Sequence, residues 1–166
     1  MSLEDNKAVL KRSQKRLHAM RVSHWMTRPV VTVKPRDTLR TARRLMAEHR
    51  INQLPVVRND KLVGMVTDRD LRDAYPSSTQ LYRSKKVDEF ADSHTVEEVM
   101  TFNVIGVTPD TPLEEAAALL RRHRIGALPV VEKGKLVGIL TRSDLLNFLL
   151  SERNKLPYDS GGRVRR

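Results

Sequence analysis

The feature that most constrains the fold is an internal repeat, because residues 26–72 occur a second time, without a gap, as residues 100–146. The offset is 100 − 26 = 74 residues, and about half of the aligned positions are identical. Since a repeated segment folds as a repeated unit, we expect two copies of one small structure. A glycine, a threonine and an aspartate keep their spacing in both copies, as Gly64, Thr67 and Asp70 and as Gly138, Thr141 and Asp144.

The composition is that of a folded protein without cysteine chemistry. The 166 residues and a hydrophobic content of 39% suffice for one compact domain or a tightly packed pair of small ones. Cysteine is absent, which excludes disulfides, thiolate metal sites and cysteine nucleophiles. No apolar run approaches the roughly 20 residues that span a bilayer, and the basic N-terminus lacks the apolar stretch of a secretory signal. We therefore expect a cytoplasmic protein with no membrane segment.

The chain is strongly basic, with 31 Lys+Arg against 20 Asp+Glu and a formal charge of +11. Two solvated basic tails are the usual meaning of such charge runs. A phosphate-bearing partner such as nucleic acid is the alternative, and it stays open at this point. The basic residues at the two ends are Lys7, Lys11, Arg12, Lys15, Arg16 and Arg21, and Arg163, Arg165 and Arg166.

The first half of each copy predicts a strand and a helix. Residues 30–33 and 104–107 are rich in β-branched side chains, which predicts short strands that end at a proline. A helix follows, with Thr38 or Thr111 near its N-cap and its apolar residues on one face. His49 and His123 close the two helices, where a cation is favoured by the helix dipole.

The second half of each copy predicts a hairpin and a last helix. Residues 54–57 and 62–66 predict two strands joined by a turn at Asn59 and Asp60, and the second copy uses Lys133 and Gly134 for that turn. A short helix then starts after Thr67 in the first copy and after Thr141 in the second. The order β-α-β-β-α, found twice, predicts an α/β (α+β) fold.

The repeat divides the chain into five parts. We expect a basic N-terminal extension over 1–21, a first unit over 22–74, a connection over 75–94, a second unit over 95–150 and a flexible tail over 151–166. Residues 81–90 of the connection predict a helix, and Thr95 with Glu98 predicts a capping box that opens the second unit. Trp25, which aligns with Val99, is expected in a core or an interface.

The segment from Gly64 to Asp70 can carry chemistry. A glycine in a strand allows another backbone or a ligand to approach closely. Thr67 lies where the strand gives way to a helix, so its hydroxyl and the helix amides can meet an anion. Asp70, one turn later, can accept hydrogen bonds from two hydroxyl groups. An anion-binding position beside an acceptor for two hydroxyls is what a ribose phosphate requires. An N-cap threonine with a first-turn aspartate is the purely structural alternative.

With these motifs in both copies, the chain resembles a tandem pair of CBS domains, the cystathionine β-synthase type regulatory module, over about residues 22–150. The marks are the Met-Thr pairs at 26–27 and 100–101, the Leu-Pro-Val-Val segments at 54–57 and 128–131, and the Gly-x-x-Thr-x-x-Asp segments. The resemblance implies two units packed as a pseudo-two-fold pair, with two clefts that bind adenosyl ligands.

The resemblance also implies the site residues. The threonine and aspartate hold phosphate and ribose, backbone near the first strand borders adenine, and residues before Leu-Pro-Val reach the phosphates. The latter are Asn52-Gln53 and Gly126-Ala127; neither pair is basic, so we expect two clefts that are not equivalent, with Arg69, Arg142 and Lys86 as candidate substitutes. The full candidate set is Thr32, Val33, Asn52, Gln53, Pro55, Gly64, Thr67, Asp68, Arg69, Asp70, Gly106, Val107, Ala127, Pro129, Gly138, Thr141, Arg142, Ser143 and Asp144.

The predicted function is a non-catalytic regulatory module. Its effector would be AMP, ADP, ATP, S-adenosylmethionine or a cyclic dinucleotide, with no obligatory cofactor and no metal. The signal would pass by a conformational shift to an effector protein, and a homodimer is expected. The alternatives are a nucleic-acid-binding protein that acts through its basic tails, and a structural module with inactive clefts. The five histidines show no metal-ligand spacing, and Ser23-His24 lacks the partners of a hydrolase triad.

Overall fold

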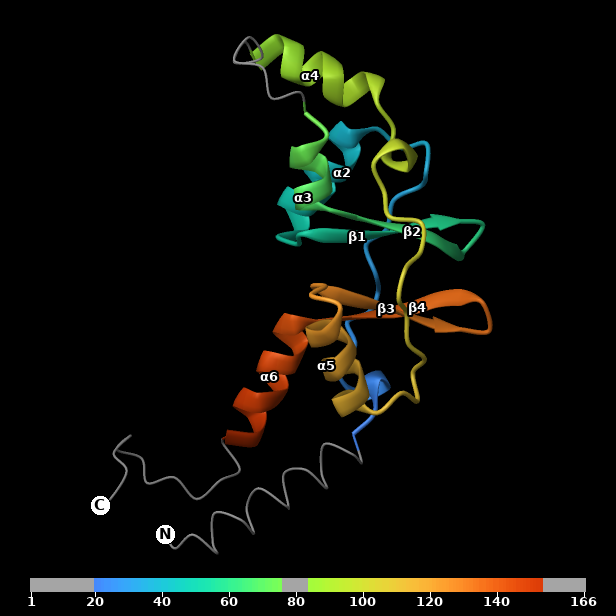
Figure 1. Ribbon diagram of the computed structural model, residues 1–166, viewed down its shortest axis with the longest axis vertical. Coiled ribbons are helices and arrows are strands. Elements are labelled where there is room, and N and C mark those ends of the chain that lie inside the picture. Colours follow the sequence, from blue (N-terminus) through green and yellow to red (C-terminus); the bar gives the residue numbers. More distant parts are fainter. Residues whose placement is uncertain (1–19, 76–83, 154–166) are drawn as a thin grey trace, which may run out of the picture.

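Two repeat units stack on one another in the computed structural model, which describes residues 20–75 and 84–153 (Figure 1). The first unit holds α2 (Leu39–His49), β1 (Gln53–Arg58), β2 (Lys61–Thr67) and α3 (Asp68–Asp73). The second holds α5 (Leu113–Arg122), β3 (Ala127–Glu132), β4 (Lys135–Thr141) and α6 (Arg142–Arg153). The hairpins face each other across the middle and the helices lie on the outer sides. The predicted α/β fold of two repeated units is confirmed. The predicted basic tails lie outside the described residues except for Arg21, and residues 151–153, predicted as part of the flexible tail, belong to α6.

The two hairpins owe their common geometry to their turns. β1 pairs with β2, and β3 with β4, in antiparallel two-stranded sheets. The central turn residues have positive φ, 52° and 62° at Asn59 and Asp60 and 48° and 80° at Lys133 and Gly134. Such pairs are typical of type I′ turns, which match the twist of antiparallel strands. The predicted turn positions are confirmed.

The first predicted strand of each unit is shorter than the sequence indicates. Residues 30–33 contribute a parallel bridge between Val33 and Val56, and residues 104–107 contribute one between Val107 and Val130. The Val33 N–H donates to the Pro55 carbonyl at 3.1 Å. Residues 27–31 lie between the two units instead of beside β1 (Figure 1). They therefore do not extend the bridge at Val33 into a longer strand.

The opening segment of each copy packs on the core of the other unit. The 3-10 helix η1 (Val22–His24) brings Val22 and Met26 into the core of the second unit. The 3-10 helix η3 (Val96–Glu98) brings Val96 and Met100 into the core of the first. Figure 1 shows both segments crossing between the units. This reciprocal exchange joins the units through both cores.

The exchanged methionines explain two of the repeated glycines. A Cβ on Gly64 would lie 2.5 Å from the Met100 Sδ, and a Cβ on Gly138 would overlap the Met26 Sδ. Each glycine therefore leaves room on its strand for a methionine that arrives from the other copy. Trp25 follows the same exchange, since its ring lies edge-on against Phe148 with centroids 5.2 Å apart, in the predicted core position.

The N-termini of the first helices differ between the units. The Thr38 hydroxyl accepts from the Thr41 N–H at 3.2 Å, as an N-cap does, and this prediction is confirmed. In the second unit the N-cap of α5 is Pro112, which has no side-chain acceptor. The Thr111 hydroxyl instead accepts from the Thr108 N–H at 3.0 Å, so it stabilises the turn before the helix.

The predicted capping box that opens the second unit is present. Glu98 accepts from the Thr95 N–H at 3.1 Å and from the Thr95 hydroxyl at 2.8 Å. These hydrogen bonds from Thr95 lower the pKa of the Glu98 carboxyl, because they stabilise its charged form; the nearby His94 acts in the same direction and desolvation acts against it.

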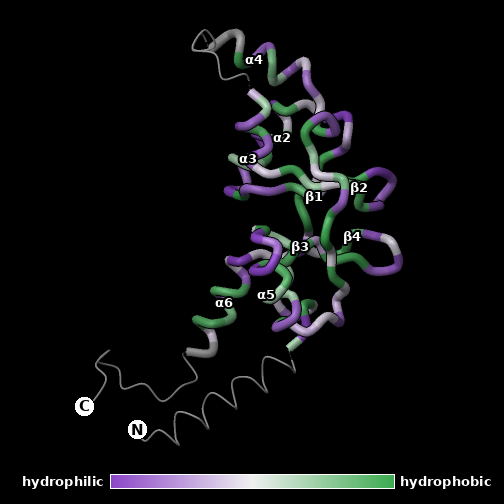
Figure 2. The backbone as a smooth tube through the Cα atoms, viewed as in Figure 1, coloured by the Kyte–Doolittle hydropathy of each residue, from purple (hydrophilic) through white to green (hydrophobic). Residues whose placement is uncertain are grey.

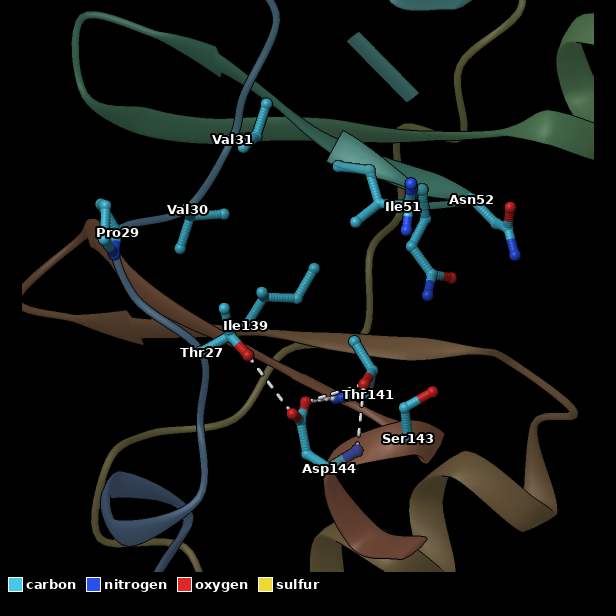
Figure 3. Close-up of a pocket in the computed structure, with 12 residues that line it drawn as sticks. Thr27, Pro29, Val30, Val31, Ile51, Asn52, Ile139, Thr141, Ser143 and Asp144 are labelled. Carbon is cyan, nitrogen blue, oxygen red and sulfur yellow. Dashed lines mark hydrogen bonds between the residues drawn. The ribbon is translucent and has the colours of Figure 1, made fainter. Parts of the chain in front are cut away.

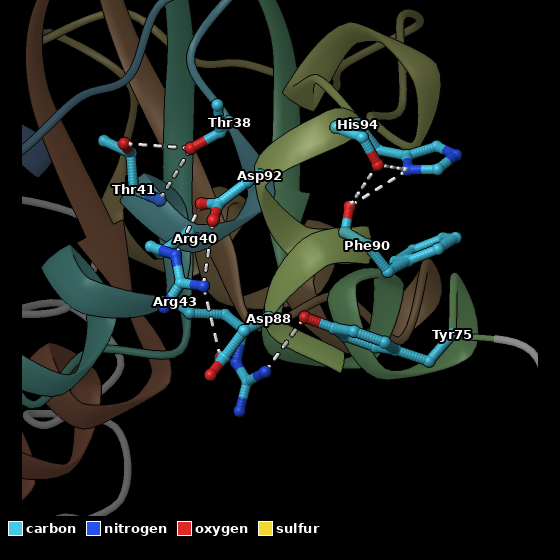
Figure 4. Close-up of polar contacts among 10 residues, drawn as sticks. Thr38, Arg40, Thr41, Arg43, Tyr75, Asp88, Phe90, Asp92 and His94 are labelled. Atoms are coloured by element: carbon cyan, nitrogen blue, oxygen red, sulfur yellow. Dashed lines mark hydrogen bonds and ion pairs between the residues drawn. The ribbon is translucent and has the colours of Figure 1, made fainter. Parts of the chain in front are cut away.

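The helix predicted over 81–90 is α4 (Ser84–Ser93), which ends three residues later than expected and whose start before Ser84 falls outside the described residues. It packs on the outer side of α2 (Figures 1 and 4).

The contact between the units is apolar in its centre. A small cluster of Met65, Ala127 and Ile139 lies between the hairpins, with Val30 and Val104 packed against it. Figure 2 shows hydrophobic backbone in the middle of the strands and hydrophilic backbone at the hairpin turns. The interface therefore has an apolar centre and polar edges.

Candidate functional site

A cavity of about 300 Å³ opens between the two units (Figure 3). Three segments line it: the crossing segment 27–31, the loop from α2 into β1 and the end of β4 with the start of α6. We call this cavity the first cleft. Its lining residues are Thr27, Pro29, Val30, Val31, Arg50, Ile51, Asn52, Gln53, Ile139, Thr141, Ser143 and Asp144.

The polar side of the first cleft is built by Thr141 and Asp144. Thr141 ends β4, and the Asp144 Oδ2 accepts from both its N–H and its hydroxyl, at 2.7 Å each. The Asp144 N–H donates back to the Thr141 hydroxyl oxygen at 3.3 Å. These bonds satisfy amides at the start of α6 and fix the carboxylate in one orientation.

The other carboxylate oxygen of Asp144 faces the crossing segment. Oδ1 accepts from the Thr27 hydroxyl at 3.3 Å (Figure 3). A carboxylate oxygen has two lone pairs, so Oδ1 has room for a further donor. Asp144 is therefore a fixed acceptor at the edge of the cavity.

The first unit contains the same arrangement. Asp70 Oδ2 accepts from the Thr67 N–H at 2.8 Å and from its hydroxyl at 2.7 Å. The capping pair of threonine and aspartate that the structural alternative requires is thus present in both copies. This does not exclude ligand binding, since the capping pair uses Oδ2 and leaves Oδ1 available.

The first cleft combines residues from both copies. Asn52 of the first copy lies opposite Thr141, Ser143 and Asp144 of the second (Figure 3). Gln53 of the first copy lines the same cavity. The sequence predicts which residues of the two copies are equivalent, but not that a loop of one copy faces the helix start of the other. The lining residues that the candidate set omits are Thr27, Pro29, Val30, Val31, Arg50, Ile51 and Ile139.

The other candidates have structural surroundings of their own. Val33, Pro55, Val107 and Pro129 are buried around the parallel bridges, and Thr32 is half-buried beside them. A Cβ on Gly106 would lie 3.2 Å from the Pro129 carbonyl oxygen.

The candidate charged residues near the helix starts also have assigned contacts. The Arg142 Nε donates to the Ile125 carbonyl at 3.0 Å, and Asp68 pairs with Arg72 at 2.8 Å. Arg69 is exposed. The side chain of Lys86 lies outside the described residues.

The difference between Asn52-Gln53 and Gly126-Ala127 has a packing cause. A Cβ on Gly126 would lie 2.6 Å from the Gln53 Oε1. The glycine of the second copy thus lies against the side-chain amide of Gln53 from the first. The local asymmetry that the sequence shows is therefore also present in the structure.

Two kinds of site find no support in the described residues. Over 20–75 and 84–153 there is no group of three or more His, Asp or Glu side chains that could hold a metal ion. Within the same part of the chain, none of the helices has the length and apolar character that crossing a membrane requires.

Comparisons with known proteins identify the family of the repeated unit. The family model of the CBS domain matches residues 22–77 and 96–151. A CBS domain-containing protein of Dictyostelium discoideum is 36% identical over 141 residues, which cover 84% of this chain and 97% of the relative. An inosine-5'-monophosphate dehydrogenase of Korarchaeum cryptofilum is also 36% identical, over 146 residues, but the match covers 87% of this chain and 27% of that enzyme.

Solved structures are similar over most of the chain. CBSX2 in complex with AMP has a TM-score of 0.67 and 32% identity, with 80% of this chain and 98% of that chain covered. The CBS domain pair of MJ0100, in complex with 5-methylthioadenosine and S-adenosyl-L-methionine, has a TM-score of 0.66 and 28% identity, covering 80% of this chain and 98% of that chain. The chain belongs to the CBS domain family and is a tandem CBS pair.

Proposed function

We propose that this CBS pair is a regulatory module that binds an adenosyl ligand in the first cleft and has no catalytic activity of its own. The observation that carries the proposal is the position of Asp144, a carboxylate fixed through one oxygen with the other at the edge of the cavity. The complexes of CBSX2 with AMP and of MJ0100 with S-adenosyl-L-methionine support it, because both ligands contain adenosine.

The lining of the first cleft suits an adenosine. Val30, Val31 and Ile139 supply an apolar wall against which a purine can pack. A ribose hydroxyl can donate to the Asp144 Oδ1, in addition to or in place of the Thr27 hydroxyl. The ribose would then lie at the start of α6, and whatever the ligand carries on its 5′ carbon would lie toward Asn52.

We propose a second cleft, which the internal repeat relates to the first. Its counterpart residues are Thr67 and Asp70 from the first copy and Gly126 and Ala127 from the second. Ser143 of the first cleft corresponds to Arg69, so the second cleft has a cation where the first has a hydroxyl. We propose that the two clefts differ in ligand preference, with more negative ligands favoured in the second.

The proposed signal is a change in the relative orientation of the two units. A ligand in the first cleft contacts Asn52 of one unit and Asp144 of the other, so it binds best to one arrangement of the two. Its effect on the equilibrium can be no larger than this difference in affinity. We propose that a homodimer, or a separate effector protein, receives the change.

Thermal unfolding with a panel of AMP, ADP, ATP, S-adenosylmethionine and a cyclic dinucleotide tests the proposal. A ligand at a hundred times its Kd stabilises the folded state by about 2.7 kcal/mol, which raises Tm by several degrees. Guanosine monophosphate, which shares ribose and phosphate, is the matched control for adenine preference. If no member of the panel changes Tm, the module is structural and the ligand proposal is wrong.

A further inference from the structure

One helix of the fold, α4, has no described counterpart on the second unit. It is fixed on the first unit by charge: Arg40 of α2 pairs with Asp88 at 3.2 Å and donates two hydrogen bonds to Asp92 (Figure 4). It is also fixed by packing, since Ala91 is 2% exposed. The α4 helix therefore covers a defined face of the first unit.

Aromatic contacts complete this face. The Phe90 ring lies 5.1 Å from that of Tyr75, between centroids, and Tyr75 follows α3. The Arg43 guanidinium of α2 donates to the Tyr75 hydroxyl at 2.9 Å (Figure 4). The first unit thus receives α4 with a cation on α2 and an aromatic residue after α3.

The chain enters the two units by the same path. The carbonyl of His94, just after α4, accepts from the Leu39 N–H at 3.0 Å, and the carbonyl of Met20 accepts from the Leu113 N–H at 2.9 Å. His94 and Met20 differ by the repeat offset, 94 − 20 = 74 residues. Residues 10–19 therefore occupy the place in the sequence that residues 84–93 of α4 occupy before the other unit.

The charges of the helix face and of the segment before it differ in sign between the two units. The counterpart of Arg40 is Glu114. The α4 helix carries Asp88, Glu89 and Asp92 besides Lys85 and Lys86, while its counterpart carries four cations and no acidic residue. These cations are Lys11, Arg12, Lys15 and Arg16. The two partners of Arg40, Asp88 and Asp92, correspond to Gln14 and His18, so the cations of this segment flank the paired positions and do not occupy them. The attraction between Glu114 and this segment therefore comes from the net positive charge of the segment.

Two apolar positions of this contact are also retained, while Phe90 corresponds to Arg16. The counterpart of the buried Ala91 is Leu17, and the counterpart of Tyr75 is Leu149, which is 56% exposed. A leucine exposed to this extent at a position that is covered in the other unit indicates a face that receives a further segment.

We propose that residues 10–19 dock on the α5 and α6 face of the second unit as the counterpart of α4. Leu17 then takes the place of Ala91, and Arg16 takes the place of Phe90 and lies beside Leu149. Docking uses the cations of this segment within the molecule, so it competes with any binding of nucleic acid by the same residues.

Cysteine cross-linking tests the proposal, since the chain has no cysteine of its own. Arg16→Cys with Leu149→Cys reproduces the Phe90 and Tyr75 contact and should give an intramolecular product with a short bismaleimide. The matched control is Lys15→Cys with Leu149→Cys, because the counterpart of Lys15 is Glu89, which is exposed on α4. The first pair should react several-fold more than the control.

Other outcomes would overturn the proposal. A disulfide- or maleimide-linked dimer through Leu149→Cys would show that a second copy covers this face. Equal reaction of the two pairs would show that the segment has no fixed register, and absence of intramolecular product in both would show that it does not dock.

A charge exchange provides an independent measurement on the same cysteine pair. Glu114→Arg should reduce the yield several-fold, because it places a cation against a cationic segment. Adding His18→Asp, at the counterpart of Asp92, should restore it, since this recreates the pairing of Arg40. A yield that neither change affects would contradict an α4-like orientation.

Discussion

At the scale of single residues, Asp144 has two separable roles. Its Oδ2 holds the start of α6 through Thr141, and its Oδ1 lies at the first cleft. Asp70 has the first role in the same geometry, and we propose that it faces the second cleft. The two aspartates are therefore matched controls for each other, because they differ in the cleft they face and not in the cap they form.

We predict that Asp144→Ala and Asp70→Ala each destabilise the fold by about 1 kcal/mol, the usual effect of losing a helix N-terminal cap. Each should also weaken binding at its own cleft by about tenfold or more, because a hydrogen bond to a charged acceptor is lost. Isothermal titration calorimetry should show one binding event lost in each variant and both lost in the double variant. Unchanged binding in variants with lowered Tm would mean that the aspartates are caps only.

At the scale of elements, the exchanged opening segments hold the pair together. Each supplies a methionine that lies over a glycine of the opposite hairpin, Met26 over Gly138 and Met100 over Gly64. The space for these side chains exists only because the strands have no Cβ there. This contact therefore couples the conformation of one unit to the position of a segment from the other.

We predict that Gly138→Ala destabilises the protein by about 1–3 kcal/mol, the usual range for overpacking, because its Cβ overlaps Met26. In the Met26→Ala background, Gly138→Ala should lower the free energy of unfolding by less than it does in the wild-type protein. The double-mutant cycle is measured by urea unfolding. Additive effects of the two changes on the free energy of unfolding would show that Gly138 is required for its backbone conformation and not to make room for Met26.

Local patterns predicted most of the elements. The hairpins follow from two apolar runs around Asn59-Asp60 and Lys133-Gly134, whose residues accept positive φ. The strands over 30–33 and 104–107 were overestimated, because β-branched composition indicates an extended backbone but not a neighbouring strand. Pro112 rather than Thr111 caps α5, a shift of one residue that propensity does not resolve.

The candidate site was predicted in part. The sequence identified Asn52, Gln53, Thr141, Ser143 and Asp144, which the structure places around one cavity. It did not indicate that the first two come from one copy and the others from the other copy, because a repeat defines equivalence and not contact. The sequence also did not indicate the apolar wall of the cavity, because Val30, Val31 and Ile139 look like ordinary core residues in sequence.

At the scale of the whole molecule, the exposed apolar face of α6 is a candidate dimer interface. Leu146 and Leu150 are each 59% exposed, and their neighbour Leu149 is the one for which we propose an intramolecular partner. The counterpart of Leu146 on α3 is Arg72, so this apolar surface belongs to the second unit alone. A two-fold dimer that pairs α6 with α6 would bury it on both sides, because such an interface is self-complementary.

We predict that Leu146→Lys with Leu150→Lys converts a dimer into a monomer, since four lysines would meet across the two-fold axis in place of four leucines. Analytical ultracentrifugation at several protein concentrations measures the change.

The matched control is Phe102→Lys, which replaces a side chain of similar exposure, 64%, away from α6 and should leave the dimer intact. A wild-type protein that sediments as a monomer at all concentrations would contradict the prediction. Dissociation by Phe102→Lys and not by the leucine changes would instead place the dimer contact beside the crossing segment of the second copy, where a bound ligand would change it directly.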